Sequence, residues 1–329
     1  MDRATKEHTL SENRQDSQFI KSIRISFCVS LYLCLFIYPF AIYAESQSIT
    51  IIYQQNKTFA KKIVNRVNNK LISKNHQTQL LAFENIDAES KNLINNTHLI
   101  ATFGISATEY ALKSNPRAPI ISFLIPRHAY QYLSALYQGN NWTVNFIDHP
   151  LERQLLLIKY LLGQDKVIGT ILGNDSEQKK QQLTSLGKSL KQEIIVDSIS
   201  SSDHLISSLK SLTNKIDVLL ALPDPVVFNN QTIRGTLLLT YRKNIPMIGF
   251  SRGYVKAGAI ASLYSDSKQI SDQSYRLIVR HIESDGTLNK QYFPDDFHIA
   301  INEKVARSLG INLVDIKKLT SRIKRDERK

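Results

Sequence analysis

The chain has 329 residues, of which 42% are hydrophobic, so it is long and apolar enough for one large domain or two smaller ones. Its two cysteines, Cys28 and Cys34, lie in one apolar segment, which excludes disulfides and thiol chemistry from the rest of the chain. The formal net charge is +13, but no basic patch with interleaved aromatic residues accompanies it, and this argues against a nucleic-acid-binding function.

The N-terminal part of the sequence is typical of an exported protein. Residues 1–22 are polar, mixed in charge and assigned no fold, whereas residues 23–46 are mostly apolar and end near the small residues Ala44 and Ser46. This pattern predicts a secretory signal peptide, with the mature chain beginning between Glu45 and Gln47. An inner-membrane anchor formed by residues 25–44 is the alternative, because about twenty apolar residues can span a bilayer. In both cases we expect the body of the protein to be periplasmic or otherwise extracytoplasmic.

From Ser48 onward, β-branched runs alternate with segments in which apolar residues recur at helical spacing. This alternation predicts strands at 48–54, 78–83, 98–104 and 118–126, and helices at 58–71 and 106–114. Strand and helix in this order favour a parallel sheet with helices on both faces. The alternation stops between Arg127 and Asp148, and we interpret this segment as the crossover to a second lobe.

A second series follows, which predicts helices at 150–162, 176–190, 203–212 and 228–242, and strands at 166–173, 193–199, 217–223 and 245–250. Helix 269–282 is expected to return to the first lobe, and strand 297–302 to close the second. The predicted fold is therefore α/β, with two doubly wound parallel-sheet lobes and an interlobe ligand cleft that closes by hinge motion. The expected boundaries are 47–148 plus 265–290 for the N-terminal lobe, 149–264 plus 291–312 for the C-terminal lobe, and 313–329 for a basic tail.

The last thirteen residues, KKLTSRIKRDERK, carry seven basic residues against two acids. This composition predicts a solvated, frayed C-terminus. Attraction to an anionic membrane surface fits the same charge better than nucleic-acid binding does.

Helix starts that follow strands supply the first candidate binding residues. Ser106 and Thr108 lie where free backbone N–H groups favour a carboxylate, although the same hydroxyls serve as helix caps. Asn174 occupies the equivalent turn of the second lobe. Asp224 lies between two prolines after a buried strand, where its carboxylate suits either a ligand ammonium or a helix N-terminus.

Gly249 to Gly253 spells G-x-S-x-G, the nucleophile elbow of serine hydrolases, and Asp285 and His298 follow in a suitable order. No Gly-rich oxyanion loop precedes this motif, and the segment after it is broken by glycine. A hydrolase that uses Ser251 is therefore the weaker interpretation. The stronger one is that polar and aromatic side chains line a binding cleft, among them Ser251, Tyr254, Tyr264, Phe103 and Gln54.

Other chemical signatures are absent from the sequence. There is no G-x-x-x-x-G-K-[ST] motif for nucleotide hydrolysis and no H-E-x-x-H motif, and the eight histidines are scattered. We therefore expect neither a metal ion nor another cofactor.

The sequence also resembles a known family. The runs LLALPDPVVFN, TYRKNIPMIGFS, YVKAGAIASLYSD and FHIAINEKVARSLGINL are similar to ABC transporter substrate-binding proteins, the family that includes tryptophan- and tyrosine-type binding proteins. The resemblance is clear over roughly the last hundred residues and extends to the stretch from Ser48 to Gly173.

The resemblance implies the type I periplasmic binding protein fold and an exported protein that delivers a small solute to an ABC permease, powered by a separate ATPase. It implies an amino acid or related zwitterion as ligand, with Ser106 and Thr108 at the carboxylate and Asp224 at the amine. The prolines on both sides of Asp224 depart from the family pattern and leave the ligand's identity open. A periplasmic sensor with the same cleft is the alternative function. The expected ligand-binding residues are Gln54, Ser106, Thr108, Asn174, Asp224, Ser251, Tyr254 and Tyr264.

Overall fold

A computed structural model describes residues 48–139, 141–283 and 291–327. The predicted signal segment and Asp285 lie outside the described residues. Within the described ranges, no helix is both long and apolar enough to cross a membrane.

The first lobe is built on a six-stranded sheet in the order β11-β5-β4-β3-β1-β2, in which all neighbouring strands run parallel. Its strands are β1 (Ser48–Tyr53), β2 (Gln77–Ala82), β3 (Leu99–Phe103), β4 (Ile120–Ile125), β5 (Trp142–Phe146) and β11 (Gln291–Tyr292). Side chains alternate between the two faces, so the neighbours Ile51 and Ile52 of β1 belong to different hydrophobic cores. This sheet is therefore buried on both sides.

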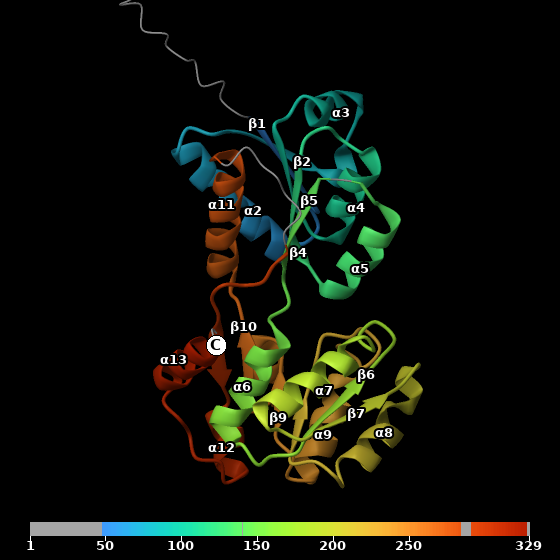
Figure 1. The fold of residues 1–329 in the computed structure, drawn as a ribbon, viewed down its shortest axis with the longest axis vertical. Coiled ribbons are helices and arrows are strands. Elements are labelled where there is room, and N and C mark those ends of the chain that lie inside the picture. Colours follow the sequence, from blue (N-terminus) through green and yellow to red (C-terminus); the bar gives the residue numbers. More distant parts are fainter. Residues whose placement is uncertain (1–47, 140, 284–290, 328–329) are drawn as a thin grey trace, which may run out of the picture. The chain divides into compact units, whose positions relative to one another are not determined.

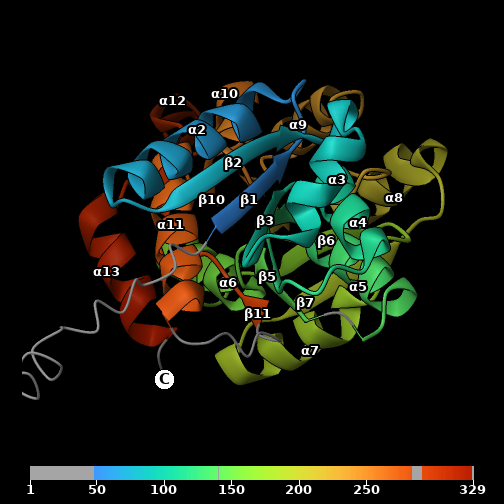
Figure 2. The same ribbon diagram turned by 90° about the horizontal axis from the view of Figure 1, so that it is seen from above.

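Helices α2 (Thr58–Ser73) and α11 (Ser267–Glu283) cover one face of the first sheet, and α3 (Ala88–Asn95), α4 (Ile105–Ser114) and α5 (Arg127–Leu136) cover the other (Figure 2). Helix α11 is far from α2 in sequence but shares its core through Ile270 and Ile278. The predicted return of this helix to the first lobe is thus what the structure shows.

The second lobe holds another six-stranded sheet, in the order β12-β10-β9-β8-β6-β7. Its strands are β6 (Ile168–Leu172), β7 (Ile194–Ser198), β8 (Val218–Leu220), β9 (Met247–Gly249), β10 (Ala261–Tyr264) and β12 (His298–Ile301). Only the edge pair β10 and β12 is antiparallel among the pairings of this sheet in the described residues. The predicted α/β class with two parallel-sheet lobes is confirmed, with this antiparallel edge as an addition.

Both faces of the second sheet are also covered by helices (Figure 1). One face carries α6 (Leu151–Leu162), α7 (Lys179–Leu190), α12 (Glu303–Ser308) and α13 (Ile316–Asp326). The other carries α8 (Leu205–Leu212), α9 (Ile233–Arg242) and α10 (Arg252–Ala257).

The segment from Arg127 to Asp148, expected to be a crossover, instead contains helix α5 and strand β5. Every residue of β5 is buried, and Trp142, Val144 and Phe146 pack into the core on the face covered by α4 and α5. Helix α5 buries only Ala129 and Leu133. Two core-facing apolar positions are too few to indicate a helix from the sequence. The connection to α6 is therefore short and comprises residues 147–150.

The C-terminal tail is also not frayed in its described part. Helix α13 begins at Ile316, is capped by Asp315, and buries Leu319 and Ile323 completely in the core it shares with α6. Its charges pair within the protein, as in the ion pair between Lys324 and Asp296 at 2.6 Å. The prediction of a solvated tail is wrong because the apolar positions of one helical face were masked by the surrounding basic residues.

One lobe boundary also differs from the expected one. Gln291 and Tyr292 form β11, which pairs with Val144 and Asn145 in the first sheet, although the sequence grouped them with the second lobe.

Candidate functional site

A cavity of about 1490 Å³ lies where the carboxyl ends of strands from both lobes meet the crossovers. The second lobe contributes the segments that follow β8, β9 and β10, and the first lobe contributes the segments after β4 and β5. Ligands of α/β sheets bind at the carboxyl ends of strands, particularly where neighbouring connections diverge. We refer to this cavity as the cleft pocket.

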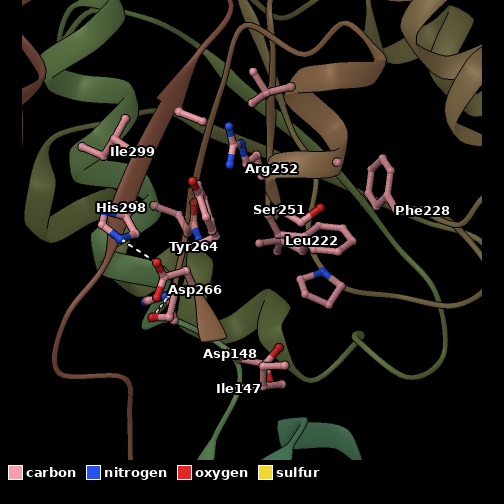
Figure 3. A pocket seen from close by; sticks show the side chains of 18 of the residues that line it. Ile147, Asp148, Leu222, Phe228, Ser251, Arg252, Tyr264, Asp266, His298 and Ile299 are labelled. Atoms are coloured by element: carbon pink, nitrogen blue, oxygen red, sulfur yellow. Dashed lines mark hydrogen bonds and ion pairs between the residues drawn. The ribbon is translucent and has the colours of Figure 1, made fainter. Parts of the chain in front are cut away.

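The side chains of the cleft pocket are mixed in chemistry (Figure 3). Figure 3 shows Tyr264 near the middle, with Asp266 and His298 on one side and Leu222 and Phe228 on the other. Such a mixture of apolar walls and a few polar groups is typical of sites for small organic molecules.

Three of the predicted site residues, Asp224, Ser251 and Tyr264, line the cleft pocket. The remaining five are not among its lining residues: Gln54, Ser106, Thr108, Asn174 and Tyr254. Ser106 is half-buried in the first turn of α4, and Asn174 is exposed in the turn after β6.

Thr108 is fully buried within the first lobe, where its hydroxyl belongs to a chain of hydrogen bonds. Its Oγ1 lies 2.6 Å from Thr102 Oγ1, and Thr102 donates to Ser122 Oγ at 2.7 Å. Trp142 Nε1 also donates to Ser122 Oγ, at 2.8 Å. Because Thr102 gives its proton to Ser122, Thr108 donates to Thr102, and its hydroxyl is thus fully used inside the core.

Tyr254 is likewise committed to the core of the second lobe. Its ring packs on Phe250 with 4.5 Å between centroids, and its hydroxyl donates to the Phe228 carbonyl at 2.9 Å. Burial raises the pKa of this phenol, so it stays a neutral donor. The Tyr254 hydroxyl therefore stabilises the backbone of the segment that precedes α9 and is not available to a ligand.

Asp224 is 3% exposed and accepts four hydrogen bonds from its own chain. Oδ1 accepts from the backbone N–H groups of Val226 and Val227, at 2.9 and 3.1 Å. Oδ2 accepts from Ser176 Oγ at 2.7 Å and from Gly173 N at 3.1 Å. A carboxylate has about four lone-pair sites, so these contacts favour the structural role of Asp224, which ties the turn after β6 to the turn after β8.

The hydrolase motif lacks a catalytic arrangement in the part of the chain that the structure describes. His298, Asp266 and Ser251 all line the cleft pocket. His298 Nε2 lies 3.3 Å from Asp266 Oδ2 and makes no hydrogen bond to Ser251. A Cβ at Gly249 would lie 2.3 Å from Tyr254 Cβ. The first glycine of the motif is thus explained by the close packing of Tyr254.

Sequence reasoning missed several charged residues of the cleft pocket, chiefly Lys179, Asp148 and Arg127. Lys179 begins α7, Arg127 begins α5, and Asp148 follows β5. Arg127 and Asp148 could have been found from their positions just after β4 and β5. They were missed because the segment that contains them was interpreted as a crossover without helices or strands.

Next to the cleft pocket, Arg153 of α6 joins the crossovers between the lobes. It is 5% exposed and donates to the Glu327 carboxylate, just after α13, through Nε and Nη2, at 2.5 and 3.1 Å. Its Nη1 donates to the Pro294 carbonyl and to His149 Nδ1, both at 2.9 Å. We call this group the Arg153 hub.

His149 connects the Arg153 hub to Ser265, which lies in the crossover between β10 and α11. Because Nδ1 accepts from Arg153, Nε2 carries the proton and donates to Ser265 Oγ at 3.2 Å, and Ser265 donates to the Asp296 carbonyl at 2.7 Å. Burial and the Arg153 charge lower the pKa of His149 to about 3, so the imidazole is neutral at physiological pH. All three connections between the lobes thus meet at one hydrogen-bonded group.

No group of three or more His, Cys, Asp or Glu side chains that could hold a metal ion occurs among the described residues.

Comparison with known proteins identifies the family. The model of the ABC transporter substrate binding protein family matches residues 137–320, more than half of the 329 residues. This chain belongs to the ABC transporter substrate-binding proteins. The predicted family resemblance is confirmed. Proteins of this family act outside the cytoplasm.

A curated relative of this substrate-binding protein is the tyrosine-binding protein of Clostridioides difficile (strain R20291). The two sequences are 26% identical over 229 residues, which is 68% of this chain and 66%, just under two thirds, of the relative.

Solved structures share the fold of this substrate-binding protein. A ligand-free, open substrate-binding protein with adhesive properties from Clostridium difficile has a TM-score of 0.65 at 16% identity, over 82% of this chain and 96% of its own. An ABC domain from Streptococcus pneumonia in complex with L-Trp has a TM-score of 0.56 at 17% identity, over 84% and 98%.

Proposed function

We propose that this substrate-binding protein captures an amino acid or related zwitterion in the cleft pocket and delivers it to the permease of an ABC importer. The observation that carries the proposal is a cavity of about 1490 Å³ lined by strand ends of both lobes in a member of this family. The curated tyrosine-binding relative and the fold shared with a protein solved with L-Trp support an amino acid. A separate ATPase powers the importer, and residues 23–46 direct the chain out of the cytoplasm.

Capture requires closure of the lobes around the solute, because the cleft pocket exceeds the volume of most small-molecule sites, which is about 300–1,000 Å³. Hinge motion of two lobes about their connecting strands is the common way to reduce such a volume. The Arg153 hub lies at these connections and provides the fixed point about which the lobes turn.

A thermal-shift screen tests the proposal. We expect one or a few proteinogenic amino acids to raise the melting temperature, since a ligand that binds only the folded chain at a hundredfold excess over Kd stabilises it by about 2.7 kcal/mol. Neither the wild type nor the Ser251→Ala variant should hydrolyse esters, because solute capture requires no nucleophile. Absence of a shift with amino acids, or ester turnover that disappears in Ser251→Ala, would contradict solute capture.

A further inference from the structure

Two opposite charges line the cleft pocket without a direct ion pair between them. Lys179 begins α7 in the second lobe, and Asp148 lies in the connection 147–150, where it is tied to the first lobe by the Arg127 N–H. Among the residues described by the structure, neither side chain takes part in an ion pair, whereas exposed pairs such as Lys180 with Glu177 do form. Neither charge is therefore neutralised by direct contact with an opposite charge in this conformation.

Lys179 is 7% exposed, and its Nζ makes one hydrogen bond, to the Pro223 carbonyl at 3.3 Å. An ammonium carries three donors, and a buried charge without a counter-ion is costly. Burial lowers the pKa of Lys179, which the carboxylates of Asp148, Asp224 and Asp175 partly offset and the charge of Arg127 reinforces. An anionic group placed beside Nζ would relieve this cost.

Asp148 is a partly buried carboxylate of the cleft pocket with free capacity, whereas Glu303, which also lines the pocket, is exposed to solvent. Its Oδ2 accepts from the backbone N–H of Arg127 at 2.7 Å, and no bond to its Oδ1 occurs among the described residues. Asp224 is filled by four internal bonds. Asp266 caps α11 through Oδ1, which accepts from the N–H groups of Lys268 and Gln269, and its Oδ2 faces His298.

A further acceptor lines the same pocket. Gln154 is 5% exposed, and its Oε1 has no hydrogen-bond partner in the described part of the chain. A buried amide oxygen without a donor has capacity for a hydrogen bond from water or from a bound ligand. Among the described residues, the cleft pocket thus offers a buried ammonium without an ion pair, Lys179, and acceptor capacity on Asp148 and Gln154.

We infer that Lys179 binds the carboxylate and Asp148 binds the ammonium of a zwitterionic head group, so that the ligand completes a charge pair between the two lobes. This inference rests on the proposed function and names the residues that carry it, in place of Ser106, Thr108 and Asp224. Because Lys179 belongs to the second lobe and Asp148 is tied to α5 of the first lobe, the ligand draws on both lobes at once. The side chain of the amino acid then occupies the apolar part of the pocket, near Leu222 and Phe228.

Ligand analogues test the charge assignment without altering the protein. The probes are L-tyrosine, tyramine, which lacks the carboxylate, and phloretic acid, which lacks the amine. In isothermal titration with the wild-type chain, we expect each analogue to bind about thirtyfold or more weakly than L-tyrosine, because each leaves one charge of the closed cleft pocket unpaired. Equal binding of either analogue and L-tyrosine overturns the inference while leaving solute capture intact.

Matched variants assign the two ends of the head group. Lys179→Gln should weaken L-tyrosine about thirtyfold or more, whereas Lys180→Gln, an exposed neighbour on the same helix, should leave affinity unchanged. Asp148→Asn keeps an oxygen for the Arg127 N–H and should cause a similar loss, with the exposed Asp175→Asn as its control. In Asp148→Asn, phloretic acid should bind as it does to the wild type, since this probe never contacts Asp148.

The outcomes separate the inference from the proposed function. If amino acids bind the wild type and Lys179→Gln equally, with both proteins folded by circular dichroism, the head-group assignment is wrong and solute capture stands. If Lys179→Gln does not fold, the analogue series still decides. If no amino acid in the screen binds the wild type, the proposed function fails and the assignment fails with it.

Discussion

Replacing Arg153 by methionine should lower the free energy of unfolding by about 3–5 kcal/mol, the range measured when one partner of a buried ion pair is removed. The Arg153 and Glu327 side chains are only 7% and 16% exposed, so Glu327 would keep a poorly solvated charge without a partner. The Pro294 carbonyl and His149 Nδ1 would also lose their donor. Methionine retains most of the apolar volume, so the loss reports the polar contacts of the Arg153 hub.

Chemical denaturation of two further variants makes this result specific. Arg276→Met removes a 2.6 Å pair with Asp295 in which both side chains are about half exposed, at 53% and 50%, and should change stability by less than about 1 kcal/mol. The double variant Arg153→Met/Glu327→Gln should recover part of the loss, because no unpaired carboxylate remains. Equal effects of Arg153→Met and Arg276→Met would show that the hub is not a buried network.

The Asp224→Asn variant should lose stability and keep its ligand affinity. An asparagine side chain has one accepting oxygen, so the amide nitrogen would face either the Val226 and Val227 N–H groups or the Ser176 and Gly173 donors. Each buried donor left without an acceptor costs about 1–3 kcal/mol, and we expect a total of about 2–5 kcal/mol.

Denaturant unfolding and titration with L-tyrosine measure the two effects of Asp224→Asn separately. The exposed Asp175→Asn serves as control and should change stability by about 0.5 kcal/mol or less. An unchanged unfolding curve together with a large loss of affinity would return Asp224 to the ligand ammonium, the role that the family resemblance implied.

The fold class was accessible from the sequence because its signals are local. The run from Ser48 to Tyr53 is rich in β-branched residues, and α2 repeats apolar residues at Ile63, Val67 and Leu71. Such periodicities fix the element type before any tertiary contact forms. Helices α5 and α13 escaped detection because each buries only two residues, while polar and basic neighbours dominate their composition.

The site was less accessible because its chemistry depends on distant partners. Asp224 is separated by 48 and 51 positions from Ser176 and Gly173, the donors that fill its Oδ2. Thr108 looks like a ligand hydroxyl at a helix start until Thr102 and Ser122 are placed beside it. A sequence shows which side chains are able to bind, but only the packed structure shows which of them remain free.

The central claim is that one zwitterionic solute occupies the cleft pocket and is held by charges from both lobes. Native mass spectrometry of the exported chain, incubated with a mixture of the proteinogenic amino acids, measures this directly. The account predicts one amino-acid adduct per chain in the wild type and in Lys180→Gln, and its loss in Lys179→Gln. A wild-type spectrum without an amino-acid adduct, or an adduct that persists undiminished in Lys179→Gln, would contradict it.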